Sequence, residues 1–145
     1  MFISKARFGK QRGFTMIEVL VALIILAIGL LGVAGVQGLS LKQTTNTATR
    51  SMVTMHAYQL SEMMRAESGS FASFAKNKSA DCSGCSTVLT NWHDDVVRDV
   101  PTAQTEVSVT TNPNETEADI TIYWTERDLG NDAVAQSYTL RTRLR

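Results

Sequence analysis

The most extended feature of the hydrophobic pattern is an apolar run from Phe14 to Leu41 that contains one charged residue, Glu18. The run has 28 residues, and about 20 apolar residues in a helix cross a hydrocarbon core of roughly 30 Å. Because basic residues favour the cytoplasmic side, the bases before the run predict one span with its N-terminus inside and its C-terminal side outside. These bases are Lys5, Arg7, Lys10 and Arg12.

Beyond Leu41 the pattern becomes amphipathic, and no strong helix breaker intervenes before the Ser68-Gly69-Ser70 stretch. Apolar residues recur near helical spacing while charged residues fall between them, so we expect the same helix to continue to about Ser68. A core-facing stripe is predicted at Leu41, Ala48, Met52, Met55, Leu60, Met63 and Met64. The methionines could also form a soft metal site, but their helical spacing favours the core.

Four glycines occupy every third position in the middle of this helix: Gly29, Gly32, Gly35 and Gly38. Each weakens a helix by up to about 1 kcal/mol relative to alanine, yet each lets another helix approach closely. Two interpretations remain open, namely small-residue packing and local melting of the helix during assembly.

The segment from Phe71 to Ser86 reads as a loop with short helical pieces. Thr87 to Val100 follows as a short amphipathic helix that ends before Pro101. Its predicted buried face consists of Leu89, Trp92, Val96 and Val100. We interpret His93-Asp94-Asp95 as part of a solvated face rather than a metal site, because neighbouring helical residues point in different directions.

Three segments with alternating apolar residues complete the chain and predict strands. The alternating positions are Thr105, Val107 and Val109; Ile120, Ile122 and Trp124; and Tyr138, Leu140, Thr142 and Leu144. Asn112-Pro113-Asn114 and Gly130-Asn131 mark turns short enough for an antiparallel meander. The predicted fold is therefore α+β, with the long helix packed on a small antiparallel sheet of about three to four strands. The terminal bases Arg141, Arg143 and Arg145 are expected on the opposite strand face, as a solvated edge or as a contact for acidic partners.

Cys82 and Cys85 have the i, i+3 spacing of a redox motif or of half a metal site. Two cysteines cannot complete a four-ligand zinc site by themselves. In an oxidising compartment a local disulfide is favoured, while free thiols and thiol-exchange catalysis stay open. No thioredoxin-like βαβ pattern surrounds the pair, which weighs against catalysis.

Composition narrows the function further. A chain of 145 residues with 43% hydrophobic content allows one modest domain beside the span. Its formal net charge is zero, so a strongly basic nucleic-acid surface is not expected. The sequence contains no glycine-rich phosphate loop, paired catalytic carboxylates or nucleophile elbow. We therefore predict no enzymatic activity, no catalytic residues, no cofactor and no small-molecule substrate.

Insertion of a carboxylate near the end of a membrane helix costs on the order of 2 to 4 kcal/mol. We therefore expect Glu18 to have a function or to pair with a cation. The string Gly13-Phe14-Thr15-Met16-Ile17-Glu18-Val19-Leu20 resembles the prepilin signal of type IV pilins and type II secretion pseudopilins. Its continuation through Gly32 is most similar to the PilV-type minor pilins, also called type IV pilus modification proteins. The resemblance covers roughly the first 40 residues.

This resemblance implies cleavage between Gly13 and Phe14 by a prepilin peptidase and methylation of the new Phe14 amine. Residues 1–13 would be the removed leader, 14–41 the membrane and assembly half of the helix, and 42–145 an exported domain. It further implies that Glu18 pairs with the terminal amine of a neighbouring subunit. The simpler alternative is that Glu18 lies at the membrane interface near a helix N-terminus.

The implied function is that of a minor pilin, which primes or modifies type IV pilus assembly together with other minor and major pilins. It would reside in the bacterial inner membrane, in contact with lipid and with its C-terminal domain in the periplasm, before entering the fibre. DNA or surface binding and twitching motility would follow only through the assembled pilus. Two alternatives are a minor pseudopilin of type II secretion and a membrane-anchored thiol oxidoreductase that uses Cys82 and Cys85.

Overall fold

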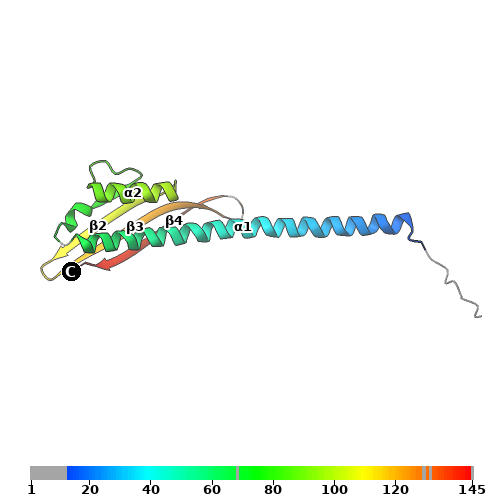
Figure 1. Ribbon diagram of the computed structural model, residues 1–145, viewed down its shortest axis with the longest axis horizontal. Helices are drawn as coiled ribbons and strands as arrows, with labels where there is room; N and C mark the ends of the chain where they lie inside the picture. The colour runs from blue at the N-terminus through cyan, green and yellow to red at the C-terminus, as the bar shows by residue number, and fades with distance from the viewer. Residues whose placement is uncertain (1–12, 68, 129, 131, 145) are drawn as a thin grey trace, which may run out of the picture. The chain divides into compact units, whose positions relative to one another are not determined.

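The computed structural model describes residues 13–67, 69–128, 130 and 132–144. The chain divides into two compact units, Met1–Leu39 and Ser40–Arg145, and we call the second unit the head. The predicted leader falls almost wholly within residues 1–12, which lie outside the described residues, as do Ser68, Asn131 and Arg145. Figure 1 shows the order of the elements along the chain.

Helix α1 runs continuously from Met16 to Ala66, which confirms the predicted long helix. A short 3-10 helix, η1, spans Phe71–Phe74, and helix α2 spans Thr87–Asp99. The side chain of Ser86 caps α2, since its hydroxyl accepts a hydrogen bond from the Leu89 amide at 3.3 Å. After Asp99 the helix stops, as the prediction from Pro101 required.

The head contains one antiparallel sheet with the strand order β1-β2-β3-β4. The strands are β1 (Lys76–Ser79), β2 (Gln104–Asn112), β3 (Glu115–Arg127) and β4 (Ala133–Arg143). The register aligns the apolar faces, because Ile120 lies opposite both Val107 and Leu140. All three predicted strands are confirmed. Strands β2 and β3 extend beyond their predicted alternating positions, whereas β4 begins earlier than predicted and ends at Arg143, one residue before the predicted position Leu144.

Strand β1 was missed, because its sequence Lys-Asn-Lys-Ser has neither β-branched residues nor apolar alternation. It pairs with β2 through Lys76 opposite Val107 and Ser79 opposite Thr105, with an irregularity between them. Tertiary pairing rather than local preference therefore makes it a strand. The predicted loop at Phe71–Ser86 is thus partly an edge of the sheet, although its helical piece is present as η1.

One hydrophobic core lies between a single face of the sheet and the two helices. The indole nitrogen of Trp92 donates to the carbonyl of His56 at 2.9 Å and joins α2 directly to α1. The buried apolar side chains are Val53, Ala57, Leu60, Met64, Phe74, Leu89, Trp92, Val96, Val100, Ala103, Val107, Ala118, Ile120, Ile122 and Trp124. The head is consequently a two-layer α+β unit, and the predicted fold class is confirmed.

The buried face of α1 differs from the predicted one. Leu60 and Met64 are buried as expected, but Leu41, Ala48 and Met55 are exposed. The face that meets the sheet passes through Val53, His56, Ala57, Leu60, Ser61 and Met64. Two polar residues, His56 and Ser61, belong to this buried face. A prediction that relies on apolar residues alone therefore places the face incorrectly.

Candidate functional site

The start of α1 places the residues that carried the sequence prediction. Gly13 and Phe14 precede the helix, and the Phe14 side chain is 82% exposed. The backbone amide of Glu18 donates to the Thr15 carbonyl at 3.1 Å and to the Thr15 hydroxyl at 3.3 Å. Thr15 therefore caps the helix, and the spacing Thr-x-x-Glu is the signal that would have revealed this role. No described residue forms an ion pair with the Glu18 carboxylate.

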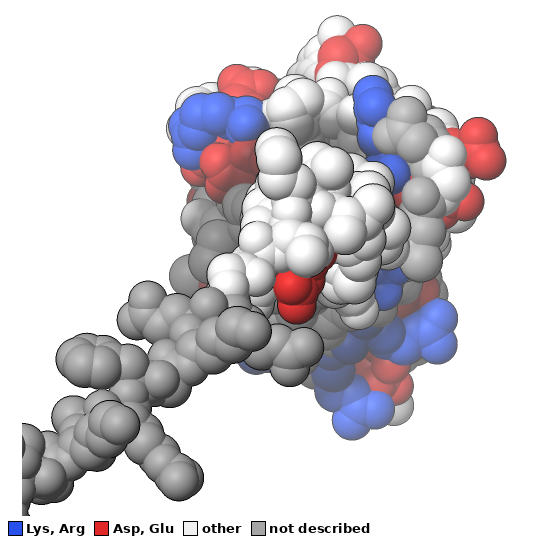
Figure 2. All heavy atoms as spheres, turned by 90° about the vertical axis from the view of Figure 1, so that its right-hand side faces the viewer, with Lys and Arg blue, Asp and Glu red and all other residues white. Residues whose placement is uncertain are grey.

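The apolar part of α1 is uncovered within the chain. Large apolar side chains from Met16 to Leu41 are all about half exposed or more, and Glu18 is the one acidic residue among them. Figure 2 views the molecule from this side, where an acidic group stands among uncharged atoms. By length and composition, α1 is the one helix of the described residues that could cross a membrane. An exposed apolar surface of this extent is typical of a membrane or protein interface.

The four glycines of this segment lie within continuous helix. Beyond the helix's own nearby backbone, no heavy atom lies within 4 Å of a Cβ placed on Gly29, Gly32, Gly35 or Gly38. Nothing inside the described chain therefore requires glycine at these positions. Close approach by another helix, or bending on assembly, stays a prediction.

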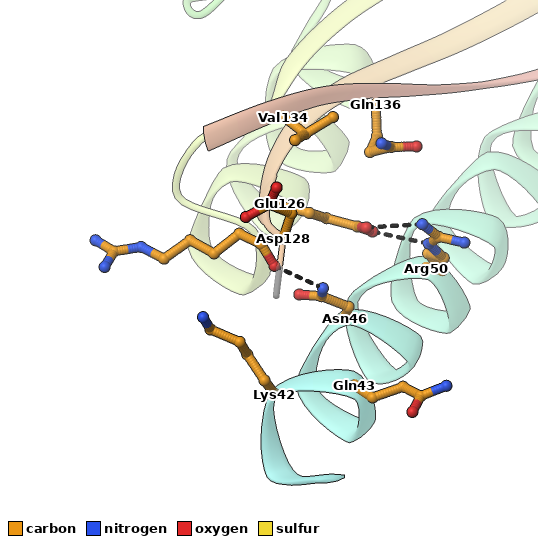
Figure 3. A pocket seen from close by; sticks show the side chains of 9 residues that line it. Lys42, Gln43, Asn46, Arg50, Glu126, Asp128, Val134 and Gln136 are labelled. Atoms are coloured by element: carbon orange, nitrogen blue, oxygen red, sulfur yellow. Dashed lines mark hydrogen bonds and ion pairs between the residues drawn. The ribbon is translucent and has the colours of Figure 1, made fainter. Parts of the chain in front are cut away.

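A second polar site lies in the head, where α1 meets the ends of β3 and β4 (Figure 3). The Arg50 guanidinium donates to both carboxylate oxygens of Glu126, at 2.9 and 2.8 Å. The indole nitrogen of Trp124 also donates to Glu126, at 2.9 Å, and the Asn46 amide donates to the Arg127 carbonyl at 3.1 Å. Arg50 and Trp124 hold the pKa of Glu126 below its usual range, chiefly through the hydrogen bonds from Arg50.

The groove at this site has a volume of about 340 Å³. It is lined by Lys42, Gln43, Asn46, Arg50, Glu126, Arg127, Asp128, Val134 and Gln136. The sequence prediction missed this site, because its residues come from α1, β3 and β4 and share no local motif. The alternating inward positions Trp124 and Glu126 at the end of β3 were its only sequence signal.

Comparison with known families finds one similarity, and it covers the N-terminal site. A family model for the prokaryotic N-terminal methylation motif matches residues 9–34. The match supports a type IV pilin-like protein. The prepilin-type motif thus spans Gly13, Phe14, Glu18 and the first part of the apolar helix. Neither the curated proteins nor the solved structures gave a match.

The prepilin-type motif points to a family of structural, generally non-enzymatic proteins. The Sγ atoms of Cys82 and Cys85 lie 2.06 Å apart, at disulfide distance. The sheet is antiparallel throughout the described strands, so this pair does not follow the strand of a parallel βαβ unit. Among the described residues, no group of three or more His, Cys, Asp or Glu side chains could hold a metal ion.

Polar contacts hold both the strand that precedes Cys82 and Cys85 and the loop that carries them. The Lys76 ammonium donates to the carbonyls of Asn77, Ser79 and Thr105 at 3.4, 3.1 and 3.0 Å. Burial lowers the pKa of Lys76. The Nε2 atom of His93 lies 3.2 Å from the Ala80 carbonyl, which fixes the loop from the side of α2.

The prediction that His93 belongs to a solvated face was wrong. His93 is 2% exposed and its Nδ1 atom lies 2.8 Å from the Thr105 hydroxyl. His56 is likewise buried, and its Nε2 atom lies 2.9 Å from an Asp99 carboxylate oxygen. Both histidines join α1 or α2 to the rest of the head, which explains why polar residues interrupt the apolar stripes.

The described terminal arginines find partners across the sheet. Arg141 forms two hydrogen bonds with the Asp119 carboxylate, at 2.7 and 2.9 Å, and Arg143 forms an ion pair with Glu115. Both arginine side chains remain largely exposed. The predicted solvated edge therefore carries cross-strand ion pairs between β3 and β4.

Proposed function

We propose that the protein is a PilV-type minor pilin, which primes or modifies assembly of a bacterial type IV pilus with other pilins. The observation that carries the proposal is the prepilin-type motif at the start of a long apolar helix, followed by a small α+β head. The uncovered apolar surface needs lipid before assembly and neighbouring subunits afterwards. No active site is required for this role.

In this proposal the chain is itself a substrate. A prepilin peptidase cuts the bond between Gly13 and Phe14 and methylates the Phe14 amine. Removal of the leader takes away four of the 14 basic residues and leaves 14 acidic ones, so the mature chain carries a net charge of about −4. The head then lies in the periplasm and the helix stays in the inner membrane until incorporation.

Glu18 has the central role in assembly. The new amine at Phe14 provides the cation that the carboxylate lacks, and pairing between subunits would set the register of the stack. The Thr15 cap is compatible with this role, since the Thr15 hydroxyl accepts a hydrogen bond from the backbone amide of Glu18 and leaves its carboxylate unoccupied.

The first test is the N-terminal sequence and mass of the protein isolated from cells with an active prepilin peptidase. We expect a chain that begins at Phe14 and carries one methyl group. Recovery of the intact chain, with its leader attached, would overturn the proposal.

A minor pseudopilin of type II secretion is the competing function, because the same motif serves both systems. Deletion of the gene separates them. Lost twitching with normal secretion supports the pilus, whereas lost secretion with normal twitching supports the pseudopilus.

A further inference from the structure

The groove in the head contains a cation, Lys42, that has no partner among the described residues. Lys42 lies on the first turn of α1 within the head and is only partly exposed, and its ammonium forms no hydrogen bond or ion pair with any described residue. An ammonium that forms no ion pair is free to attract an anion, while the stem of the lysine side chain packs against its neighbours. This groove therefore favours an anionic ligand.

The charged residues that line the groove carry a net charge of +1. The Arg50 and Glu126 side chains neutralise each other, and an Asp128 carboxylate oxygen accepts the Asp132 amide at 2.8 Å. Counting Lys42 and Arg127 as well, the lining carries three basic and two acidic residues. A ligand with a single negative charge would balance it.

The position of Lys42 along the helix indicates the source of that anion. The 28 residues from Phe14 to Leu41 extend about 42 Å at ~1.5 Å per residue, which matches the 40–45 Å of a bilayer with its headgroups. Lys42 is the next residue and Asn46 lies one turn further. If Phe14 lies among the inner headgroups, these two residues lie at the level of the outer phosphates.

We propose that this groove binds the phosphate of an anionic phospholipid headgroup, with Lys42 as the charged donor. Asn46 and Gln136 line the same groove and supply amide groups for the phosphate and the glycerol hydroxyls (Figure 3). The inference rests on the proposed function, because it requires the apolar half of α1 to span the membrane. Its role would be to hold the head against the outer leaflet until the subunit enters the fibre.

Native mass spectrometry of the full-length protein in detergent, titrated with phosphatidylglycerol, tests the proposal. Lys42→Gln should lower the retained lipid about fivefold, the effect of one basic residue near an anionic surface. Lys78→Gln, which removes the same charge from an exposed residue of β1, should change it little. The basic leader is present in every variant, so any lipid that it binds is the same in all of them. An equal loss in both variants, or no loss in Lys42→Gln, would overturn the proposal.

A second variant distinguishes lipid binding in the groove from general attraction between a basic residue and anionic lipid. Lys42→Gln combined with Thr44→Lys moves the charge two residues along, to an exposed position on the other side of the helix. Lipid retention should stay low in this variant, and full recovery would show that the charge alone is sufficient. Inorganic phosphate at millimolar concentration should not displace the lipid, and complete displacement would refute a lipid site.

The two proposals can fail separately. Membrane fractionation and the mass of the N-terminus, measured on the same variants, report the proposed function. Normal insertion and processing with unchanged lipid retention in Lys42→Gln would refute the groove alone. Absence of insertion in the unaltered protein would refute the minor-pilin proposal first, and the lipid site with it.

Discussion

The Arg50–Glu126 pair joins α1 to β3 at a position where the carboxylate is almost completely buried. The Glu126 side chain is 5% exposed, whereas that of Arg50 is 58% exposed. A buried carboxylate is tolerated only when donors replace the water it has lost. Arg50 and Trp124 supply those donors. Loss of Arg50 would therefore leave the buried Glu126 carboxylate with too few hydrogen-bond donors.

Replacement of Arg50 by alanine should lower the free energy of unfolding several times more than loss of a surface ion pair, since Glu126 would keep one indole donor in a buried position. Chemical denaturation of the full chain in detergent measures the change. Arg98→Ala is the matched control, because Arg98 pairs with Asp95 on the surface of α2, and its loss should cost less than about 0.5 kcal/mol. Equal effects of the two substitutions would contradict the expected role of Arg50.

The same pair gives the head an acid-sensitive contribution to stability. The pKa of Glu126 is lower in the folded protein than its ordinary value of 4.5, chiefly because Arg50 donates to the charged form. Its contribution is therefore complete above about pH 4.5 and is lost as the pH falls through the lower, folded pKa. Unfolding measured between about pH 7 and pH 2 should show this loss. Glu126→Gln should make the acid limb less steep, and an unchanged slope would contradict this origin.

At the scale of an element, α1 in the head uses a buried face that differs from the predicted stripe. Leu60 is completely buried, whereas Met55 is 57% exposed. The two residues are both large and apolar and lie about one and a half turns apart. They therefore form a matched pair for testing which face packs on the sheet.

Leu60→Ala should destabilise the head by about 3 kcal/mol, because it removes buried methyl groups and leaves a cavity. Met55→Ala should change the free energy of unfolding by less than about 0.5 kcal/mol, as is usual for surface substitutions. Thermal or chemical unfolding in detergent distinguishes the two. A larger effect at Met55 would restore the face predicted from sequence.

Local pattern predicted the elements whose burial is periodic and apolar, namely α1, α2 and the alternating strands. It failed where polar residues are buried by partners distant in sequence. His56 lies against Asp99, and Lys76 is held by carbonyls that include that of Thr105. The groove at Arg50 and Glu126 was missed for the same reason, since its two charges are 76 residues apart. By contrast, the N-terminal site was found because its residues are contiguous.

The loop from β1 to α2 depends on a short covalent closure. Replacing Cys82 and Cys85 by serine should lower the free energy of unfolding by about 2 kcal/mol, the chain-entropy value for so small a loop. Unfolding with and without reductant measures this, and the serine variant should not respond to reductant. Two free thiols in the protein isolated without reductant, detected by non-reducing mass spectrometry, would contradict the disulfide.

At the scale of the whole molecule, the chain combines an apolar helix that lacks internal cover with a head that has its own core. The head buries its apolar residues between the sheet and the helices, while the apolar segment exposes its own. Such a division suits a protein in which the apolar segment moves from one apolar environment to another while the head keeps its fold. In the proposed function, lipid and then other subunits cover the segment.

Glu18→Gln tests directly whether the apolar segment passes from lipid into contact with other subunits. The substitution removes the charge but keeps the shape, so membrane insertion and leader cleavage should remain close to normal. Incorporation into pili should fall severalfold, because the amide cannot form an ion pair with a neighbouring terminal amine. Immunoblotting of sheared fibres against whole-cell protein measures the ratio. Normal incorporation would favour the alternative in which Glu18 merely lies near the membrane interface.

At Lys76 the arrangement of the hydrogen-bond donors, in addition to the charge, favours one type of residue. The Lys76 nitrogen meets three carbonyl oxygens, two from β1 and one from β2. A tetrahedral ammonium has three N–H bonds that diverge from one atom, whereas a guanidinium spreads its donors in a plane. Arginine carries the same charge, but its planar guanidinium does not offer three donors that diverge from one atom. The edge of the sheet is therefore specific for lysine.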